Sequence, residues 1–115
     1  MDITSTNHQQ AAVVVLAGRM DAVSAPQFEK TCEPIIGAGA KNIVADISGL
    51  TYISSMGLGS LLSIAKKLQP RGGKLYVCGA TGMVKEVFRM AGFEAIFPMV
   101  DSSTTALETL ALENT

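Results

Sequence analysis

Short apolar runs alternate with amphipathic stretches along this chain. An apolar run of roughly four to eight residues is typical of a buried strand, because a buried helix needs a longer segment. Two further segments fit edge strands: residues 2–7, and residues 95–100, which contain Pro98. The buried runs predict three strands of one sheet, at residues 11–17, 42–47 and 73–78.

Helical periodicity fills the segments between these runs. Ser24, Pro26 and Gln27 have the form of a capping box with proline in the first turn, which predicts a first helix ending near residues 37–39. A second helix follows residues 54–55 and ends before Pro70. The apolar faces of these two helices are predicted to consist of Phe28, Cys32 and Ile35, and of Leu58, Leu61, Leu62, Ala65 and Leu68.

The C-terminal part of the chain predicts two more helices. One ends at Gly92, a favourable C-terminal cap, and the other begins at Asp101, which can cap its first turn. Strands that alternate with helices predict an α/β fold with parallel neighbours. We therefore expect a single domain over residues 1–115, with a mixed, mostly parallel β-sheet of four to five strands packed with about four helices. Apolar positions on the last two helices are Val84, Val87, Phe88 and Ala91, and Ala106, Leu107 and Leu110.

Composition excludes several classes of function. Hydrophobic residues make up 48% of the chain, enough for a core, whereas charged residues make up only 17%, below the usual quarter or so. A surface with few charges suggests that part of it meets a partner rather than water. The formal net charge of −1 gives no electrostatic footprint for nucleic acid, so no nucleic-acid partner is expected.

Membrane, metal and enzyme functions are also not expected. No apolar run approaches the ~18 residues that span a bilayer, and the polar start of the chain does not resemble a signal peptide, which predicts a cytoplasmic protein without membrane contact. Cys32 and Cys78 fit buried thiols of a reducing compartment. His8 is the only histidine, and no nucleophile–base pair or carboxylate pair is apparent, so we expect no metal, no cofactor and no catalytic activity.

Residues 46–62 are the most informative part of the chain. They predict a buried strand, a short turn and an amphipathic helix that opens at Ser54 and Ser55. The first backbone amides of a helix have no partner within the helix, and the partial positive charge there favours a phosphate. This segment therefore offers a serine that could be phosphorylated without disturbing its own helix, which predicts a phosphorylation switch.

The face of this helix opposite its predicted core is small and nearly flat. It contains Met56, Gly59, Ser60, Ser63 and Lys67, where an ordinary solvent face would be rich in charged residues. Glycine inside a helix costs about 1 kcal/mol relative to alanine, which makes sense if another protein approaches closely. We expect this face to bind a partner. The alternative is that neighbouring loops of the same chain cover it.

Four motifs resemble the STAS domain, and in particular the bacterial anti-sigma factor antagonists. They are Gly-Arg-Met-Asp at residues 18–21, Asp-Ile-Ser at 46–48, Tyr-Ile-Ser-Ser-Met-Gly-Leu-Gly at 52–59, and Gly-Phe at 92–93. In that family the phosphorylated residue lies two positions before the glycine of a Gly-Leu pair, which corresponds to Ser55 here. Many family members have aspartate where this chain has Ser54, so Ser54 is the second choice.

The resemblance implies a partner switch. The unmodified antagonist would bind a serine kinase that doubles as an anti-sigma factor, and phosphorylation by that kinase would release it until a serine phosphatase resets it. Asp21 matches a family acidic residue near the acceptor, although a turn or cap residue explains it equally. An alternative function is a STAS module in another signalling output, such as secretion regulation or a sensor complex. The residues expected to contact the partner are Asp21, Ser54, Met56, Gly57, Gly59, Ser60 and Ser63.

Overall fold

The protein folds into one five-stranded sheet with helices on both faces, in a computed structural model that describes residues 1–113. The strand order follows the chain, with β1 antiparallel to β2 and every later neighbour parallel. The predicted mixed, mostly parallel sheet is therefore confirmed, with the edge strand at residues 2–7. The other edge strand, predicted over residues 95–100, is reduced to its last two residues, because the chain forms a 3-10 helix up to Ala95. The strands are β1 (Asp2–Asn7), β2 (Ala12–Met20), β3 (Ile43–Ile53), β4 (Leu75–Cys78) and β5 (Met99–Val100).

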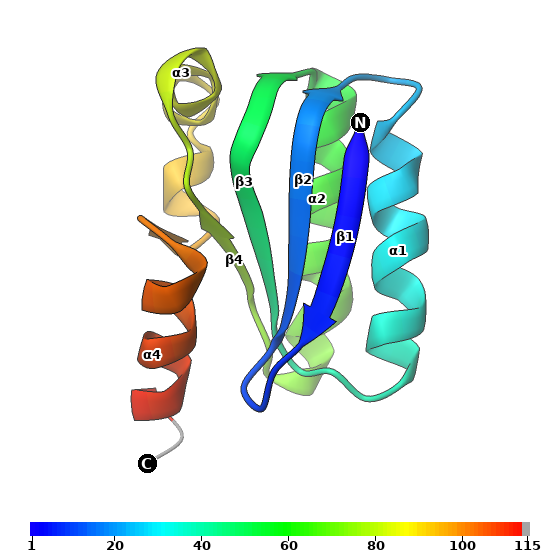
Figure 1. Cartoon of the computed structure of the whole chain (residues 1–115), viewed down its shortest axis with the longest axis vertical. Coiled ribbons are helices and arrows are strands. Elements are labelled where there is room, and N and C mark those ends of the chain that lie inside the picture. Colours follow the sequence, from blue (N-terminus) through cyan, green and yellow to red (C-terminus); the bar gives the residue numbers. More distant parts are fainter. Residues whose placement is uncertain (114–115) are drawn as a thin grey trace.

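The helices lie unevenly on the two faces of this sheet. Figure 1 shows α1 and α2 side by side behind the first three strands, whereas α4 lies beside β4 on the other side. No helix lies over the outer face of β1, where Thr4 and Thr6 are exposed (Figure 1). The helices are α1 (Ala25–Gly37), α2 (Ser55–Leu68), α3 (Gly82–Met90) and α4 (Ser103–Glu113), with short 3-10 helices η1 (Gln69–Arg71) and η2 (Phe93–Ala95).

Two apolar clusters hold the layers together. The larger one joins the sheet to α1 and α2, and its biggest members include Phe28, Met20 and Leu61, all fully buried. The smaller one joins the other face of the sheet to α4 through residues such as Val44 and Leu110. Within residues 1–113, no helix is both long enough and apolar enough to cross a lipid bilayer.

The third strand is longer than the sequence predicts. It was expected to end near residue 47, but β3 continues to Ile53 and stays paired with β2 through two irregular steps in register. Gly49 makes this possible, because a Cβ atom at that position would lie 2.9 Å from the Cβ of Ala17. The extension brings Met20 and Ile53 opposite each other at the end of the parallel pair, directly before the Ser54–Ser55 turn.

Two predicted helix caps were wrong. Ser24 precedes α1 with helical backbone angles. Its hydroxyl donates to the carbonyl of Arg19 at 2.9 Å and accepts from the amide of Asp21 at 2.9 Å, so it caps no amide of α1. At α4, the hydroxyl of Ser102 accepts from the amide of Thr105 at 3.1 Å, which is the role predicted for Asp101. The predicted cap at Gly92 is confirmed, since this glycine has the left-handed φ of 75° after α3.

Candidate phosphorylation and partner site

The candidate site lies where the parallel strands β2 and β3 end together. The amide of Ser54 donates to the carbonyl of Met20 at 2.9 Å, which joins the entrance of α2 to the end of β2. The carboxyl ends of parallel strands are a common place for functional residues, because the loops that follow converge there. The rigid sheet thus positions the first turn of α2 at one edge of the domain.

Ser54 is the N-cap of α2. Its backbone is extended, with φ −91° and ψ 172°, and its hydroxyl accepts from the amide of Gly57 at 3.2 Å. Such a cap typically stabilises a helix by about 1 kcal/mol relative to alanine. The Ser54 hydroxyl, which is half-buried, is therefore already used in holding the helix start.

Ser55 is the first residue of α2 and is exposed. Within residues 1–113 its hydroxyl makes no hydrogen bond, and of the first three amides of α2 only that of Gly57 has a partner. The amides of Ser55 and Met56 remain available to an anion, as is usual for a helix start. The two adjacent serines therefore differ: one caps the helix, and the other presents a free hydroxyl.

Asp21 shapes the loop between β2 and α1. One oxygen of its carboxylate accepts from the amides of Ser24 at 3.0 Å and Val23 at 3.1 Å. These contacts, the one from the Ser24 amide above all, hold the pKa of Asp21 below its usual value, and nearby Arg19 adds to the effect. The alternative interpretation of Asp21, as a turn residue, thus describes what it does inside the chain, while its contact with a partner stays a prediction.

The two glycines at the start of α2 have different surroundings. Gly57 is buried, and a Cβ atom there would lie 2.8 Å from the Cγ1 of Ile53 and 3.1 Å from the Cγ of Met20. Gly59 is exposed, and a Cβ atom there would meet nothing within 4 Å. Packing inside the domain therefore explains Gly57 but gives no reason for Gly59.

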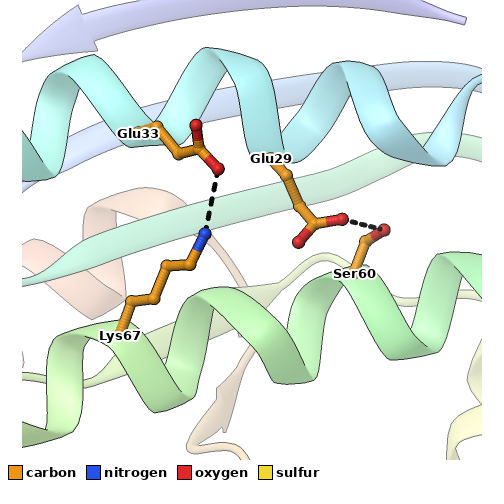
Figure 2. Close-up of polar contacts among 4 residues, drawn as sticks. All are labelled: Glu29, Glu33, Ser60 and Lys67. Atoms are coloured by element: carbon orange, nitrogen blue, oxygen red, sulfur yellow. Dashed lines mark hydrogen bonds and ion pairs between the residues drawn. The ribbon is translucent and has the colours of Figure 1, made fainter.

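Ser60 does not lie on the exposed face, so that prediction was wrong. Only 5% of the residue is exposed, and its hydroxyl donates to the Glu29 carboxylate on α1 at 3.2 Å (Figure 2). Two helical turns further along α2, Lys67 forms an ion pair with Glu33 of α1 at 2.9 Å, between the same two helices. The two acids spaced four residues apart on α1 are the sequence signal for this contact, because side chains at that spacing share one face of a helix.

The exposed part of the α2 surface is narrower than predicted. It consists of Met56, which is 55% exposed, exposed Gly59 and half-buried Ser63, beside a shallow hollow of about 380 Å³. Sequence reasoning missed two apolar side chains that follow the two strands on either side of β3, at the same edge of the sheet: Val23 after β2, which is 85% exposed, and Met83 after β4, which is 70% exposed. Exposed apolar residues gathered at one edge favour a protein-binding surface. The hollow is lined by Gly59, Leu62, Ser63, Lys66 and Lys67.

These features define a small α/β domain that presents an exposed serine at a helix start beside a surface with few charges. Within residues 1–113, no cluster of side chains could hold a metal. The chain belongs to the STAS domain family, whose model matches residues 2–106. Fold and family therefore agree with the resemblance seen in the sequence.

Several relatives of this chain within the family are named anti-sigma factor antagonists. The chain is 33% identical over 106 residues to BtrV of Bordetella bronchiseptica, provisionally named an anti-sigma factor antagonist, covering 92% of this chain and 91% of that protein. A solved anti-sigma factor antagonist from Mycobacterium paratuberculosis has the same fold, with TM-score 0.86, 23% identity and coverage of 96% and 93% of the two chains. SpoIIAA from Bacillus, solved in its phosphorylated form, matches with a TM-score of 0.76 at 20% identity, covering 95% of this chain and 99% of that chain. The unphosphorylated form of SpoIIAA also has a TM-score of 0.76, at 18% identity, covering 96% of this chain and 98% of that chain.

Proposed function

We propose that this protein is an anti-sigma factor antagonist whose binding is controlled by phosphorylation of Ser55. The unphosphorylated form binds a serine kinase that doubles as an anti-sigma factor, phosphorylation by this kinase releases the antagonist, and a serine phosphatase restores it. One observation carries the proposal most directly: Ser55 is exposed with a free hydroxyl, whereas the hydroxyl of Ser54 caps α2.

The partner surface of the proposal surrounds Ser55 at the start of α2. Met56 offers an adaptable apolar contact, and the open space above Gly59 admits the close approach of another protein. Ser63 continues this surface along the helix, whereas Ser60 and Gly57 act from within by holding α2 against its neighbours. Met56, Gly59 and Ser63 carry no charge, which suits a contact from which water is excluded.

A phosphate on Ser55 acts differently on the free protein and on the complex. It adds about −1.5 to −2 charges at pH 7, which the partner would have to desolvate in a packed interface. Within its own chain the same group lies at a helix start, where free amides and the helix dipole favour it. The free protein therefore tolerates the modification, and the cost falls on the complex.

The relatives support this cycle. BtrV carries the antagonist name over nearly the full length of this chain, and SpoIIAA has been solved in both phosphorylation states. Both SpoIIAA forms share this fold, each with a TM-score of 0.76, so that protein keeps the fold in either phosphorylation state.

The test begins with affinity capture from the native cytoplasm, using the unmodified protein and a Ser55→Asp variant as baits. We expect a serine kinase to bind only the unmodified protein. The recombinant kinase and Mg-ATP are then given to wild type, Ser55→Ala and Ser54→Asn, and the products are mapped as phosphopeptides. Ser54→Asn is the matched control, because asparagine removes the hydroxyl and still caps the helix.

We expect phosphate on Ser55 in the wild type and in Ser54→Asn, and none in Ser55→Ala. Phosphate on Ser54 that persists in Ser55→Ala would contradict the assignment. A captured kinase that binds no sigma factor would instead favour the alternative, a STAS module in secretion regulation or in a sensor complex, with the same serine chemistry.

A further inference from the structure

Arg19 lies close to the end of β2, on the sheet face opposite α1 and α2, in the part of that face that α4 leaves open. It pairs in register with Tyr52 on β3, and its guanidinium lies 4.2 Å from the centre of the Tyr52 ring. The next pair along the strands, Met20 and Ile53, is buried in the core beneath α1 and α2. Because side chains alternate along a strand, Arg19 and Tyr52 point to the opposite, open face.

This guanidinium forms no ion pair with a carboxylate in residues 1–113, although it lies near enough to Asp21 to help lower the pKa of that residue. Within residues 1–113 the side chain of Arg19 makes no ion pair and no hydrogen bond, and the residue is exposed. The neighbouring carboxylate of Asp21 is engaged by the amides of its own loop. Stacking on an aromatic ring uses the flat face of a guanidinium and leaves its in-plane N–H donors free. Arg19 is thus a preorganised cation whose donors face outward.

The direction of Arg19 determines which anion it can meet. The helix that begins at Ser55 packs on the sheet face of Met20 and Ile53, whereas Arg19 points to the opposite face. A phosphate on Ser55 and the Arg19 guanidinium therefore lie on different sides of the sheet edge. A partner that docks on the start of α2 and reaches over the edge would meet both.

We propose that Arg19, stacked on Tyr52, binds a carboxylate of the protein partner and so makes the partner's contact extend over the sheet edge. The occupant is an aspartate or glutamate side chain, because the fork of in-plane donors matches a carboxylate in a bidentate pair. This inference rests on the proposed function, since it adds a second contact to the same complex. It gives the antagonist a means of selecting among related kinases by charge.

The test uses the recombinant form of the kinase captured with the unmodified protein. It measures the dissociation constant of the complex for wild type, Arg19→Glu, Arg19→Lys and the control Lys30→Glu. Lys30 is exposed on α1 and gives the same change in net charge away from the open face. We expect affinity to fall about a hundredfold for Arg19→Glu and about tenfold for Arg19→Lys, which keeps the charge but loses the fork, as for buried charge pairs at interfaces. Lys30→Glu should stay within about threefold, as expected for a charge outside the contact. Circular dichroism melting confirms that each variant is folded.

A charge-reversal scan identifies the other half of the pair. Each surface Asp or Glu of the kinase is changed to Arg, and one of these changes should restore binding to Arg19→Glu while weakening binding to the wild type. Two results would overturn the inference: affinity of Arg19→Glu equal to that of Lys30→Glu, or the absence of any rescuing position. If that occurs while Ser55→Asp still abolishes binding, the proposed function stands without this contact. If Arg19→Glu weakens binding and Ser55→Asp does not, the contact stands and the phosphorylation switch fails.

Discussion

Gly57 and Gly59, in the first turns of α2, allow a test of which side of the helix is packed inside the domain and which side is open to a partner. Replacing either with alanine adds one methyl group to the same helix, two residues apart. In the interior of a helix, alanine is more favourable than glycine by about 1 kcal/mol. The added Cβ has open space at position 59, whereas at position 57 it would lie 2.8 Å from the Cγ1 of Ile53.

We therefore expect opposite effects on stability. Gly59→Ala should raise the free energy of unfolding by about 0.5–1 kcal/mol, the full propensity gain. Gly57→Ala should lower it by up to about 2 kcal/mol, because overpacking of about 1–3 kcal/mol exceeds the smaller gain near the helix start. For 115 residues, the unfolding entropy of about 2.1 cal/mol/K per residue makes 1 kcal/mol equal to a melting shift of about 4 °C.

Urea unfolding followed by circular dichroism measures these stabilities, and a binding titration on the same samples measures affinity for the kinase. Gly59→Ala should bind about tenfold more weakly although it is more stable, since a methyl group in a closely packed contact costs about 1–3 kcal/mol. A loss of stability in Gly59→Ala would refute the open space above that residue. A gain in stability with unchanged affinity would show that no partner covers it.

Three further predictions concern the rest of the site and the core. Ser60→Arg should lower the free energy of unfolding, measured in a urea titration, by more than about 2 kcal/mol, because the long side chain cannot fit beside Glu29. A urea midpoint equal to that of the wild type would show that Ser60 does not lie in the contact between α1 and α2. Ser55→Asp should melt close to the wild type, since an acid at a helix start contributes roughly +0.3 to +1 kcal/mol, yet it should lose kinase binding; phosphorylated protein settles the result if aspartate is too weak a mimic. Burial raises the pKa of Cys32 and Cys78 to about 12, so both thiols should stay protonated and react slowly with a thiol reagent at pH 8 until urea unfolds the chain; fast labelling of the folded protein would contradict their burial.

Hydrophobic periodicity predicted the elements of this fold but not the rotation of α2. The predicted core face is centred near Ala65, between Leu58 and Leu61, whereas the buried residues also include Ile64 and Ser60, and Leu62 is only half-buried. At 100° per residue, the buried arc is rotated by roughly 60° from the predicted one. The rotation is due to α1, which packs against one side of α2, and a helical wheel contains no information about a neighbouring helix.

At the site, too, the sequence predicts the features that depend on nearby residues but not those that depend on distant parts of the chain. The sequence placed both Ser54 and Ser55 at a helix start, because that depends on nearby residues. Which of them caps the helix depends on the extended backbone of Ser54, fixed by its hydrogen bond to the end of β2. The stacking of Arg19 on Tyr52 depends on register shifts between β2 and β3, which no spacing in the sequence reveals.

The position of the acceptor one residue inside the helix is what separates binding from folding in the proposed switch. Phosphorylation of Ser54 would disturb the cap that holds α2 and would place the new charge on a half-buried side chain. Phosphorylation of Ser55 leaves that cap and the Ser54–Met20 hydrogen bond in place. A hundredfold loss of affinity requires only about 2.7 kcal/mol, and desolvating a phosphate against an apolar contact exceeds this. Nearly all of the free-energy cost of phosphorylation therefore weakens the complex, because the domain itself does not have to reorganise.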